Sequence, residues 1–536
     1  MFKKFRLYFL LILLVEAFSF AGFFYPEFRE ITFFVILAIT LLLAIHKLEY
    51  GLLILFAELF ISSKGYLFFY EYEGTQISIR IGLFLVIMSA WLGKALLKWA
   101  STKSSFDINE EVDRYILKSK KVFEDFSDFK NFSENARKKI KSAKDKNGLN
   151  IFYSLLFIAL VWGLVNGYLQ HNSLSNIFFD FNGWIYFGIL FPLLYVIKLK
   201  SEDVKKFWYN LLLVFSASVV WLSVKTLSLL FIFSHKFNFI EQIYLWIRTS
   251  GVGEITNTEF GFSRIFMQSQ VYVVIGLLVF MSLLLLSGKQ ENKKTRKQFI
   301  IYYFISLILF ISTILISFSR SFWIGALVGF LFFCFFVFLF FYKEWRAILL
   351  MLSSLLLASV LSIGLIYGIV KFPYPEPIGN FSANLISERA TSMNDAAGSS
   401  RWNLLPVLNE EIKKAPLQGR GFGATVTYIT QDPRVLEQNP SGQYTTYAFE
   451  WGWHDIALKI GGLGLLVYVL LLGKIFVDGI ALSRKSKVES RKSLIYIALL
   501  AGLVMIVVTS AFSPYLNHPL GIGYVVLTSV ILMNKK

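Results

Sequence analysis

The stretch FIIYYFISLILFISTILISFSRSFWIGALVGFLFFCFFVFLFFY (residues 299–342) contains a single charged residue, Arg320. An apolar run of about 20 residues lies on either side of it, and each run is long enough to cross the hydrocarbon core of a bilayer as a helix. Helices are expected because lipid offers no hydrogen-bond partners to an unpaired backbone. This stretch therefore predicts two membrane helices joined by a very short turn.

Runs of the same kind recur along the chain of 536 residues, of which 56% are hydrophobic and 16% charged. Soluble domains carry roughly 25% charged residues, so the composition excludes a soluble globular enzyme. The sequence predicts an all-α polytopic membrane protein with about fourteen transmembrane helices. The predicted spans are residues 7–24, 31–46, 50–62, 77–97, 151–170, 176–197, 207–234, 270–287, 299–318, 322–342, 347–370, 455–477, 493–511 and 517–533.

The first of these runs has an alternative interpretation as a secretory signal peptide. Ser19-Phe20-Ala21 is a weak cleavage candidate, and Lys3, Lys4 and Arg6 precede the run. Because many more spans follow, we expect a retained first helix.

The net charge of +18 follows the predicted topology. With the N-terminus inside, the inside segments hold about 35 of the 53 basic residues and the outside segments about 13, as the positive-inside rule requires. Inside and outside segments alternate along the whole predicted topology without a break, and both termini are predicted to lie on the cytoplasmic side. The excess positive charge therefore needs no nucleic-acid partner.

Two long loops interrupt the spans. Residues 101–148 are predicted to be cytoplasmic, and their mixed charges are typical of a solvated helical hairpin or linker, with docking of a partner as the alternative. Residues 371–453 are predicted to face outside, and an ordered loop of that length is uncommon unless it is functional. The predicted organisation is eleven helices in residues 1–370, the outside loop at 371–453, and three helices in residues 454–536.

Several classes of site are excluded by their missing motifs. The sequence has neither a P-loop nor an HExxH motif, and its one cysteine, Cys334, lies in an apolar run. No metal and no cofactor are therefore expected. Charges inside the runs are few, and snorkelling to a nearby interface is the simplest interpretation for most of them, with the deeper Lys225 as a functional candidate. They are Arg80, Lys94, Lys225, Lys459 and Lys474.

Candidate functional residues gather in the predicted outside segments. Arg320 lies at the membrane edge, where an isolated arginine favours an anionic partner. The long loop carries Ser399-Ser-Arg401-Trp402, followed by an amphipathic helix predicted over Asn403–Lys414, with Leu404, Leu405, Leu408 and Ile412 on one face. Pro416-Leu-Gln-Gly-Arg-Gly-Phe-Gly423 follows, and its alternate glycines suit a tight backbone turn.

A histidine opens the next span. His454 follows directly after the outside loop, in Phe449-Glu-Trp-Gly-Trp-His-Asp455. If the helix already runs at Glu450, that carboxylate lies one turn before His454 on the same face and can orient the imidazole. Glu450 is also the alternative candidate for a general base.

Together these motifs resemble the O-antigen ligase and O-antigen polymerase family of bacterial membrane glycosyltransferases. The resemblance covers about residues 300–480 and rests on the order of the Ser-Arg span end, the Arg-Trp loop, the Pro-x-x-Gly-x-Gly-x-Gly segment and the histidine. Where the family commonly has His-Asn, this chain has His454-Asp455, so the role of Asp455 stays open. Fourteen spans also exceed the family's usual dozen.

The resemblance implies a GT-C-like architecture and a site at the outer face of the bacterial cytoplasmic membrane. It implies an undecaprenyl-pyrophosphate-linked glycan donor and a lipid or glycan acceptor, without metal or nucleotide. It also implies that Arg320 and Arg401 bind the pyrophosphate and that His454 removes the acceptor proton, with inversion at the anomeric carbon. Arg264 and Arg420 are further candidates for contacts with glycan or phosphate.

Three alternatives differ in class. A lipid-linked oligosaccharide flippase would carry cations along a central cavity, where Lys225 is the clear candidate. A metal-dependent glycosyltransferase would use acidic residues in the first outside loop, where Glu27 and Glu30 lie beside Arg29. A structural membrane anchor would not need the organised outside loop. Within the resembled family, the sequence does not separate ligase from polymerase.

Overall fold

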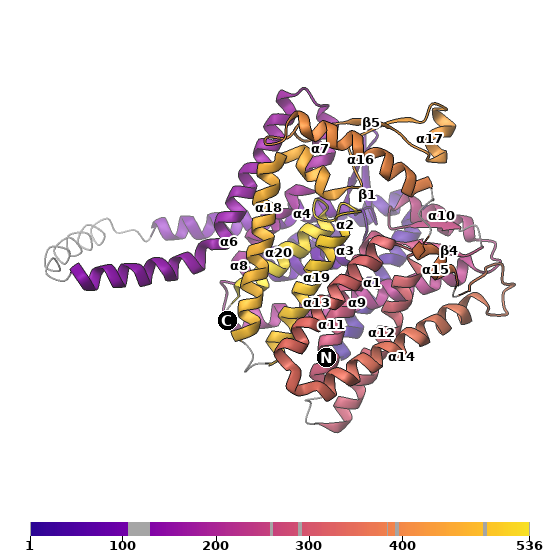
Figure 1. The fold of residues 1–536 in the computed structure, drawn as a ribbon, viewed down its shortest axis with the longest axis horizontal. Helices are drawn as coiled ribbons and strands as arrows, with labels where there is room; N and C mark the ends of the chain where they lie inside the picture. Colours follow the sequence, from indigo (N-terminus) through magenta and orange to yellow (C-terminus); the bar gives the residue numbers. More distant parts are fainter. Residues whose placement is uncertain are drawn as a thin grey trace.

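The structure is a computed structural model, and it describes residues 2–104, 129–257, 261–287, 292–382, 384–391, 396–485 and 490–534. These residues form a bundle of helices with short hairpins at one end (Figure 1). The helices are α1 Phe2–Phe24, α2 Pro26–His46, α3 Leu48–Ile61, α4 Ile79–Ser104, α6 Phe129–Leu169, α7 Leu174–Phe181, η2 Trp184–Ile189, α8 Leu190–Val196, α9 Ser201–Phe233, α10 Ile240–Thr249, η3 Gln268–Gln270, α11 Val271–Ser287, α12 Lys293–Ile316, α13 Arg320–Phe341, η4 Tyr342–Glu344, α14 Trp345–Val370, α15 Asn384–Thr391, α16 Ala396–Lys414, α17 Pro433–Gln438, α18 Gly452–Lys485, α19 Ser490–Thr509 and α20 Pro519–Met533.

Within the described residues, eleven segments are long and apolar enough to cross a membrane. One of them, Arg320–Val370, contains both α13 and α14. The fold class predicted from the sequence, an all-α polytopic membrane protein, is therefore confirmed. The count of fourteen needs a correction at α3 and α20, which have only 14 and 15 residues. At about 1.5 Å per residue such helices fall short of a ~30 Å hydrocarbon core, and most of their residues are buried against other helices.

The loops between the spans separate into two groups at opposite ends of the bundle. The segments predicted to lie outside contact one another. The guanidinium of Arg29 lies over the ring of Phe69, and three hydrogen bonds join further segments. These bonds run from Ser63 to the carbonyl of Val252, from the amide of Asn380 to the carbonyl of Gly261, and from Arg264 to the carbonyl of Ser317. The segments predicted to lie inside also meet: Lys47 pairs with Asp203, Lys4 lies over Tyr209, and Phe2 stacks on Phe299. This separation agrees with the predicted alternation, while the end that faces the cytoplasm stays a prediction.

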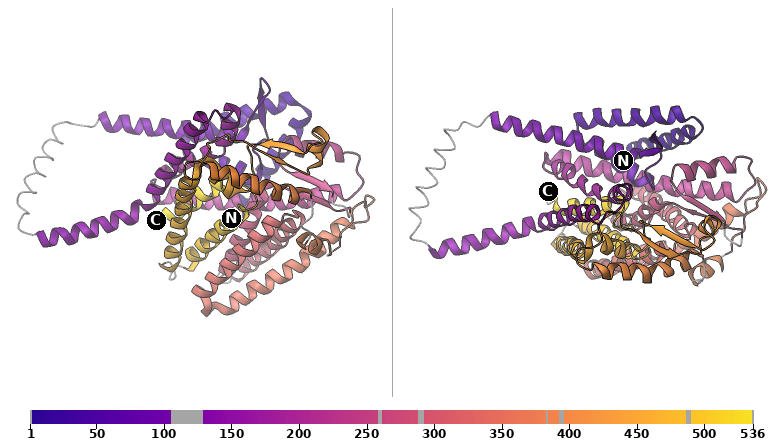
Figure 2. Two further views of the ribbon diagram at one scale, coloured as in Figure 1. Left: turned by 45° about the horizontal axis from the view of Figure 1, so that its top comes forward. Right: turned by 90° about the horizontal axis from the view of Figure 1, so that it is seen from above.

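Helices α4 and α6 extend well beyond the bundle, away from the end that carries β4 and α15 (Figures 1 and 2). Their extensions belong to the predicted cytoplasmic loop at residues 101–148. The chain is helical at both ends of that loop, and residues 105–128 lie outside the described residues.

Three antiparallel hairpins, which the sequence did not predict, lie in the loops predicted to face outside. They pair β1 (Phe69–Tyr72) with β2 (Thr75–Ser78), β3 (Glu254–Asn257) with β4 (Ser263–Phe266), and β5 (Val426–Ile429) with β6 (Gln443–Thr446). In β5–β6 the register sets Val426 opposite Thr446.

The long outer loop has a small hydrophobic core of its own, separate from the core of the bundle. It joins α16, β5 and the start of α18 (Figure 1). Its buried members are Leu404, Leu408, Ala424, Val426, Phe449, Trp451 and Leu458. The predicted amphipathic helix is thus confirmed, and it ends at Lys414 as expected from the following Pro416. It begins at Ala396, before the predicted start at Asn403, so Arg401 lies on the helix.

Candidate active site

Trp451 connects two of the predicted site residues. Its indole Nε1–H donates to the backbone carbonyl of Arg401 on α16 at 2.9 Å. Its ring stands edge-on to the imidazole of His454, with 5.9 Å between the ring centroids. Because α18 begins at Gly452, His454 lies in the first turn of that helix. The structure therefore holds Arg401 and His454 against the same side chain.

Glu450 is placed differently from the sequence hypothesis. The helix does not yet run at Glu450, so this residue is not one turn before His454 on a helical face. Its carboxylate instead forms an ion pair with the guanidinium of Arg401. The two side chains are 51% and 38% exposed, and exposed pairs of this kind contribute only about 0–1 kcal/mol. An anionic ligand could therefore replace Glu450 on Arg401 at little cost.

The turn between α12 and α13 gathers three arginines. Arg320 is the first residue of α13, directly after this turn, and Phe318 within it has a φ of 46°. Arg264 on β4 donates from Nε to the carbonyl of Ser317 at 2.9 Å. Arg389 on α15 donates from Nε to the carbonyl of Phe318 at 3.3 Å. The structure thus brings the predicted Arg264 to the turn that carries Arg320 and adds Arg389, which the sequence analysis did not single out.

The loop between α19 and α20 links these two places. Its Phe512 packs against Trp451, with 5.9 Å between ring centroids. Its Ser513 hydroxyl lies 3.4 Å from that of Ser321, the residue after Arg320. The two groups of candidate residues therefore belong to one end of the molecule. Convergence of Arg320 and Arg401 on one diphosphate stays a prediction.

Helix α18 is interrupted just below the site. Gly461 has φ 72° and ψ 173°, which breaks the helical hydrogen bonds across it. In an unbroken helix the carbonyls of residues 458 and 459 would accept from the amides of residues 462 and 463. The part from Gly462 to Lys485 is about 36 Å long at 1.5 Å per residue, enough to cross a bilayer core. This part alone is therefore long enough for a span without the first turn of α18, which carries His454.

The glycine segment, residues 416–423, forms four hydrogen bonds with the backbone of α18 on either side of Gly461. The amides of Arg420 and Gly421 donate to the carbonyls of Leu458 at 2.6 Å and Lys459 at 3.1 Å. The amides of Gly462 and Leu463 donate to the carbonyls of Pro416 at 2.8 Å and Leu417 at 3.3 Å. Unpaired backbone groups are costly at this depth, so the segment stabilises the broken helix.

Alternate glycines are needed in this segment because the backbones approach closely. Gly419, Gly421 and Gly423 all have φ between 74° and 78°. A Cβ at Gly421 would lie 2.1 Å from the amide nitrogen of Gly167 on α6. The side chain of Arg420 forms an ion pair with Glu411 on α16. The segment thus packs α6 against α18, and Arg420 belongs to this packing.

A buried charge network lies on α18 next to the site. The ammonium of Lys459 contacts Asp180 of α7 at 2.5 Å, Asp455 at 2.6 Å and the carbonyl of Tyr447 at 2.9 Å. Asp180 also accepts from the amide of Gly423 at 2.9 Å, and Asp455 accepts from Asn517. Such networks are stable only when every charge is paired, as these are. Burial, and next the Asp180 carboxylate, raise the pKa of Tyr447, so its phenol stays protonated.

Two basic residues that the sequence analysis interpreted as snorkelling are buried and paired. Lys459 is 1% exposed, and Arg80 is 4% exposed with two hydrogen bonds to Glu58, at 3.0 and 3.1 Å. The interpretation was wrong because both side chains point into the protein, where a carboxylate compensates each charge. Lys225, the deeper candidate, forms a buried pair with Glu16 at 2.7 Å.

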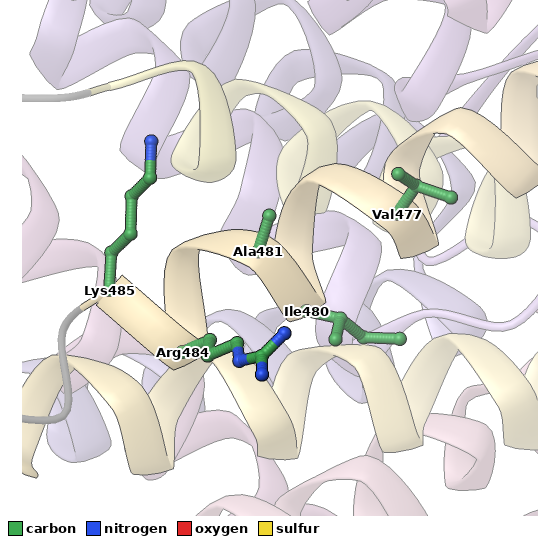
Figure 3. A pocket seen from close by; sticks show the side chains of 5 residues that line it. All are labelled: Val477, Ile480, Ala481, Arg484 and Lys485. Carbon is green, nitrogen blue, oxygen red and sulfur yellow. The ribbon is translucent and has the colours of Figure 1, made fainter.

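A cavity of about 380 Å³, which we call the polar cavity, opens beside this network. Residues of α4, α7, η2 and α18 line it, together with the loops before β1, after β6 and before α20. A second hollow, of about 430 Å³, lies at the far end of α18 and is lined by Val477, Ile480, Ala481, Arg484 and Lys485 (Figure 3). Figure 3 shows Arg484 lying toward Ile480 while Lys485 extends the other way.

Sequence reasoning missed Asp180, Asn517 and Arg389 as members of the site region, left the role of Asp455 open and interpreted Lys459 as a snorkelling charge. The spacing of Asp455 and Lys459, four residues apart on one helix, was a signal for an ion pair. Asp180 within an apolar run was another, because an acidic residue there needs a partner. Across the described ranges, no group of three His, Cys, Asp or Glu side chains gathers as a metal site would require.

Residues 305–469 match the model of a family described as O-antigen ligase, while no curated protein matches the chain. The match begins in α12 and ends in α18, so it includes Arg320, Arg401, Glu450 and His454. Together with the apolar helices, it supports glycan transfer by a multi-pass membrane protein. The match agrees with the family predicted from the motifs: residues 305–469 are similar to the O-antigen ligase family.

Proposed function

We propose that this protein transfers a glycan from undecaprenyl pyrophosphate to an acceptor hydroxyl at the outer face of the bacterial cytoplasmic membrane. The observation that carries the proposal is the contact of Trp451 with both Arg401 and His454, within the region that matches the family. One side chain thus contacts the backbone of a residue whose cation suits phosphate and the ring of an imidazole that suits proton transfer.

The arginines would bind the pyrophosphate of the donor. Guanidinium groups stay charged at any working pH and match phosphate oxygens in pairs. Arg401 exchanges its exposed pairing with Glu450 for the ligand, and Arg320 with the neighbouring Arg264 supplies further positive charge. Negative charge grows on the pyrophosphate as the sugar–oxygen bond breaks, so these cations stabilise the transition state most.

His454 would act as the general base. The acceptor oxygen attacks the anomeric carbon, the bond from that carbon to the pyrophosphate oxygen breaks, and its electron pair leaves with the pyrophosphate. The proton of the acceptor hydroxyl passes to the neutral imidazole of His454. A single displacement of this kind inverts the anomeric centre, and the proposed step uses neither metal nor nucleotide.

The alternatives receive less support from the structure. A flippase would use Lys225 along a transport cavity, whereas Lys225 is neutralised by Glu16 in the core. A metal-dependent enzyme would use Glu27 and Glu30, whereas Glu30 lies 3.8 Å from Arg29, whose guanidinium packs over Phe69. Neither pattern points to the outer loop that carries Arg401.

Deletion of the gene, followed by electrophoresis of the surface glycans, tests the proposal. Loss of a polymerase leaves single-repeat glycans on the final anchor, whereas loss of a ligase leaves long chains on the carrier lipid. Complementation with the wild type and with His454→Ala shows whether this site performs the transfer. Unchanged glycans in the deletion strain would contradict the proposal.

A further inference from the structure

We propose that the polar cavity binds an uncharged sugar ring of a glycan substrate. Its volume of about 380 Å³ falls within the range of ~300–1,000 Å³ that small-ligand sites occupy. Rings of Tyr66, Tyr186, Phe179 and Phe449 line it beside polar groups. Aromatic faces accept the C–H faces of a sugar, while its hydroxyls require hydrogen-bond partners around the edge.

Among the described residues, fourteen buried side-chain polar atoms have no hydrogen-bond partner, and four of these atoms belong to residues that line this cavity. They are the hydroxyl oxygen of Tyr186, the side-chain carbonyl oxygens of Gln268 and Asn517, and Oδ1 of Asp455, which lies 2.6 Å from the ammonium of Lys459. Tyr186 is only 2% exposed. Buried polar groups in proteins are rarely left without a partner, so their gathering at one cavity indicates a ligand that supplies the missing bonds.

The chemistry of these atoms selects the ligand. The amide of Asn517 donates to Asp455, which fixes its carbonyl oxygen as the atom left to accept. Carbonyl oxygens need a ligand that donates hydrogen bonds, and a sugar hydroxyl does so. A fully ionised phosphate offers acceptors alone, so it would leave these oxygens unsatisfied.

The buried charges that line the cavity favour a neutral ligand as well, while Lys64 lines it as an exposed cation. Arg80 is compensated by Glu58, and Lys459 by Asp180 and Asp455. The buried cations that line the cavity thus already have carboxylate partners. Pyrophosphate binding is better served by the arginines near Trp451 and at the α12–α13 turn.

The position of the cavity relates it to the proposed transfer, on which this part of the inference rests. Asp455 lines the cavity and directly follows His454, so the cavity and the proposed base share the first turn of α18. A glycan with one ring in the cavity would extend past that turn toward His454. The ring belongs either to the acceptor or to the donor glycan.

Saturation-transfer NMR on the full-length protein in nanodiscs tests the proposal. The probes are methyl glycosides of glucose, galactose and N-acetylglucosamine, with inorganic pyrophosphate as the competing anion. Tyr186→Phe and Gln268→Leu should each reduce the signal of the best-bound glycoside at least fivefold, and pyrophosphate should not displace it. Unchanged signals in both variants, or no binding of any glycoside to the wild type, would overturn the proposal.

The matched control is Tyr524→Phe. Tyr524 is also 2% exposed, but its hydroxyl donates to the carbonyl of Leu499 at 2.9 Å. This variant should lower the unfolding temperature and keep sugar binding, whereas Tyr186→Phe should keep the unfolding temperature and lose binding. If Tyr186→Phe instead lowered the unfolding temperature and kept sugar binding, the hydroxyl of Tyr186 would have a structural role, which would contradict the proposal.

Two further experiments distinguish a failure of the cavity proposal from a failure of the proposed function. His454→Ala should bind the glycosides as the wild type does, and sugar binding by a protein without transfer activity would overturn the proposed function alone. In a transfer assay, a raised KM for the acceptor in Tyr186→Phe assigns the ring to the acceptor, and a raised KM for the donor assigns it to the donor. Normal values of both KM would overturn the cavity proposal alone.

Discussion

The indole N–H of Trp451 donates to the backbone carbonyl of Arg401 at 2.9 Å, across 50 residues of sequence. This bond fixes α16 of the outer loop to the start of α18. Because the same ring also contacts the imidazole of His454, movement of α16 would disturb both candidate residues together. The geometry of the proposed site, with its arginines and its histidine, therefore depends on how the outer loop is folded.

Replacing Arg320 or Arg401 with alanine should lower the rate of glycan transfer by roughly 10²–10³, because each would remove a preorganised cation from the leaving pyrophosphate. Lysine at either position should restore activity only in part, since it lacks the planar fork. Arg484→Ala, at the far end of α18, is the control and should transfer normally (Figure 3). A structure with the donor bound in which Arg320 and Arg401 do not reach one pyrophosphate would contradict the shared site.

His454→Ala should lower transfer by on the order of 10²–10⁴ while binding of the carrier lipid survives. In the wild type, the rate should rise with pH as the imidazole loses its proton and then level off, and this dependence should disappear in the variant. Chelators should have no effect on the rate. An inactive Glu450→Gln together with an active His454→Ala would reassign the base to Glu450, and loss of donor binding in His454→Ala would make His454 a phosphate ligand.

Cysteine labelling should place residues 371–453 outside and residues 101–148 in the cytoplasm. The native cysteine, Cys334, lies half-buried on α13 and is first replaced by serine. Single cysteines at exposed positions such as Ser441 should react with a membrane-impermeant reagent in intact cells. Reaction of Ser441→Cys only after the inner face is opened would reverse the predicted orientation.

Gly421→Ala should lower the free energy of unfolding by on the order of 3 kcal/mol or prevent accumulation of the protein. The new methyl group would meet the backbone of Gly167 at 2.1 Å, and alanine rarely adopts a φ of 78°. Gly473→Ala is the control, because a Cβ there meets no atom within 4 Å. Thermal unfolding in detergent compares the two, and equal unfolding temperatures would contradict the close packing of α6.

Lys459→Met should lower the free energy of unfolding by about 3–5 kcal/mol, because Asp180 and Asp455 would be left without their buried cation. Lys474→Met is the control on the same helix, since its pair with Asp478 is partly exposed and contributes little. The comparison uses thermal unfolding of both variants. A stable Lys459→Met protein would show that the two carboxylates take up protons or water instead.

Much of the fold follows from patterns that the sequence displays directly. Apolar runs predicted the helices, because a helix that crosses a bilayer must have about 20 apolar residues. The distribution of lysine and arginine predicted which loops group together, because cytoplasmic loops carry an excess of these residues. The helices α3 and α20 were predicted, but as full membrane spans, and the three hairpins were not predicted. These elements are stabilised by contacts between residues far apart in the sequence, and such contacts cannot be predicted from the local order of apolar and polar residues.

The candidate site was only partly predictable. Arg401, His454 and the amphipathic face of α16 could be identified because each follows a local motif. The partner of Glu450 could not, since it depends on where α18 begins, and one turn of difference moves the carboxylate from His454 to Arg401. The alternate glycines predicted a tight turn, but their contact with a broken helix required the tertiary structure.

The repair of α18 by the glycine segment has a consequence for chimaeras between relatives. A graft of the outer loop that ends where the chain enters the membrane would separate the segment from Pro416 to Gly421 from the four backbone groups that it completes around Gly461. The unit that can be exchanged therefore extends from the loop through residue 463 and includes the surface of α6 around Gly167. Domain borders drawn where the chain enters the membrane would cut through this unit.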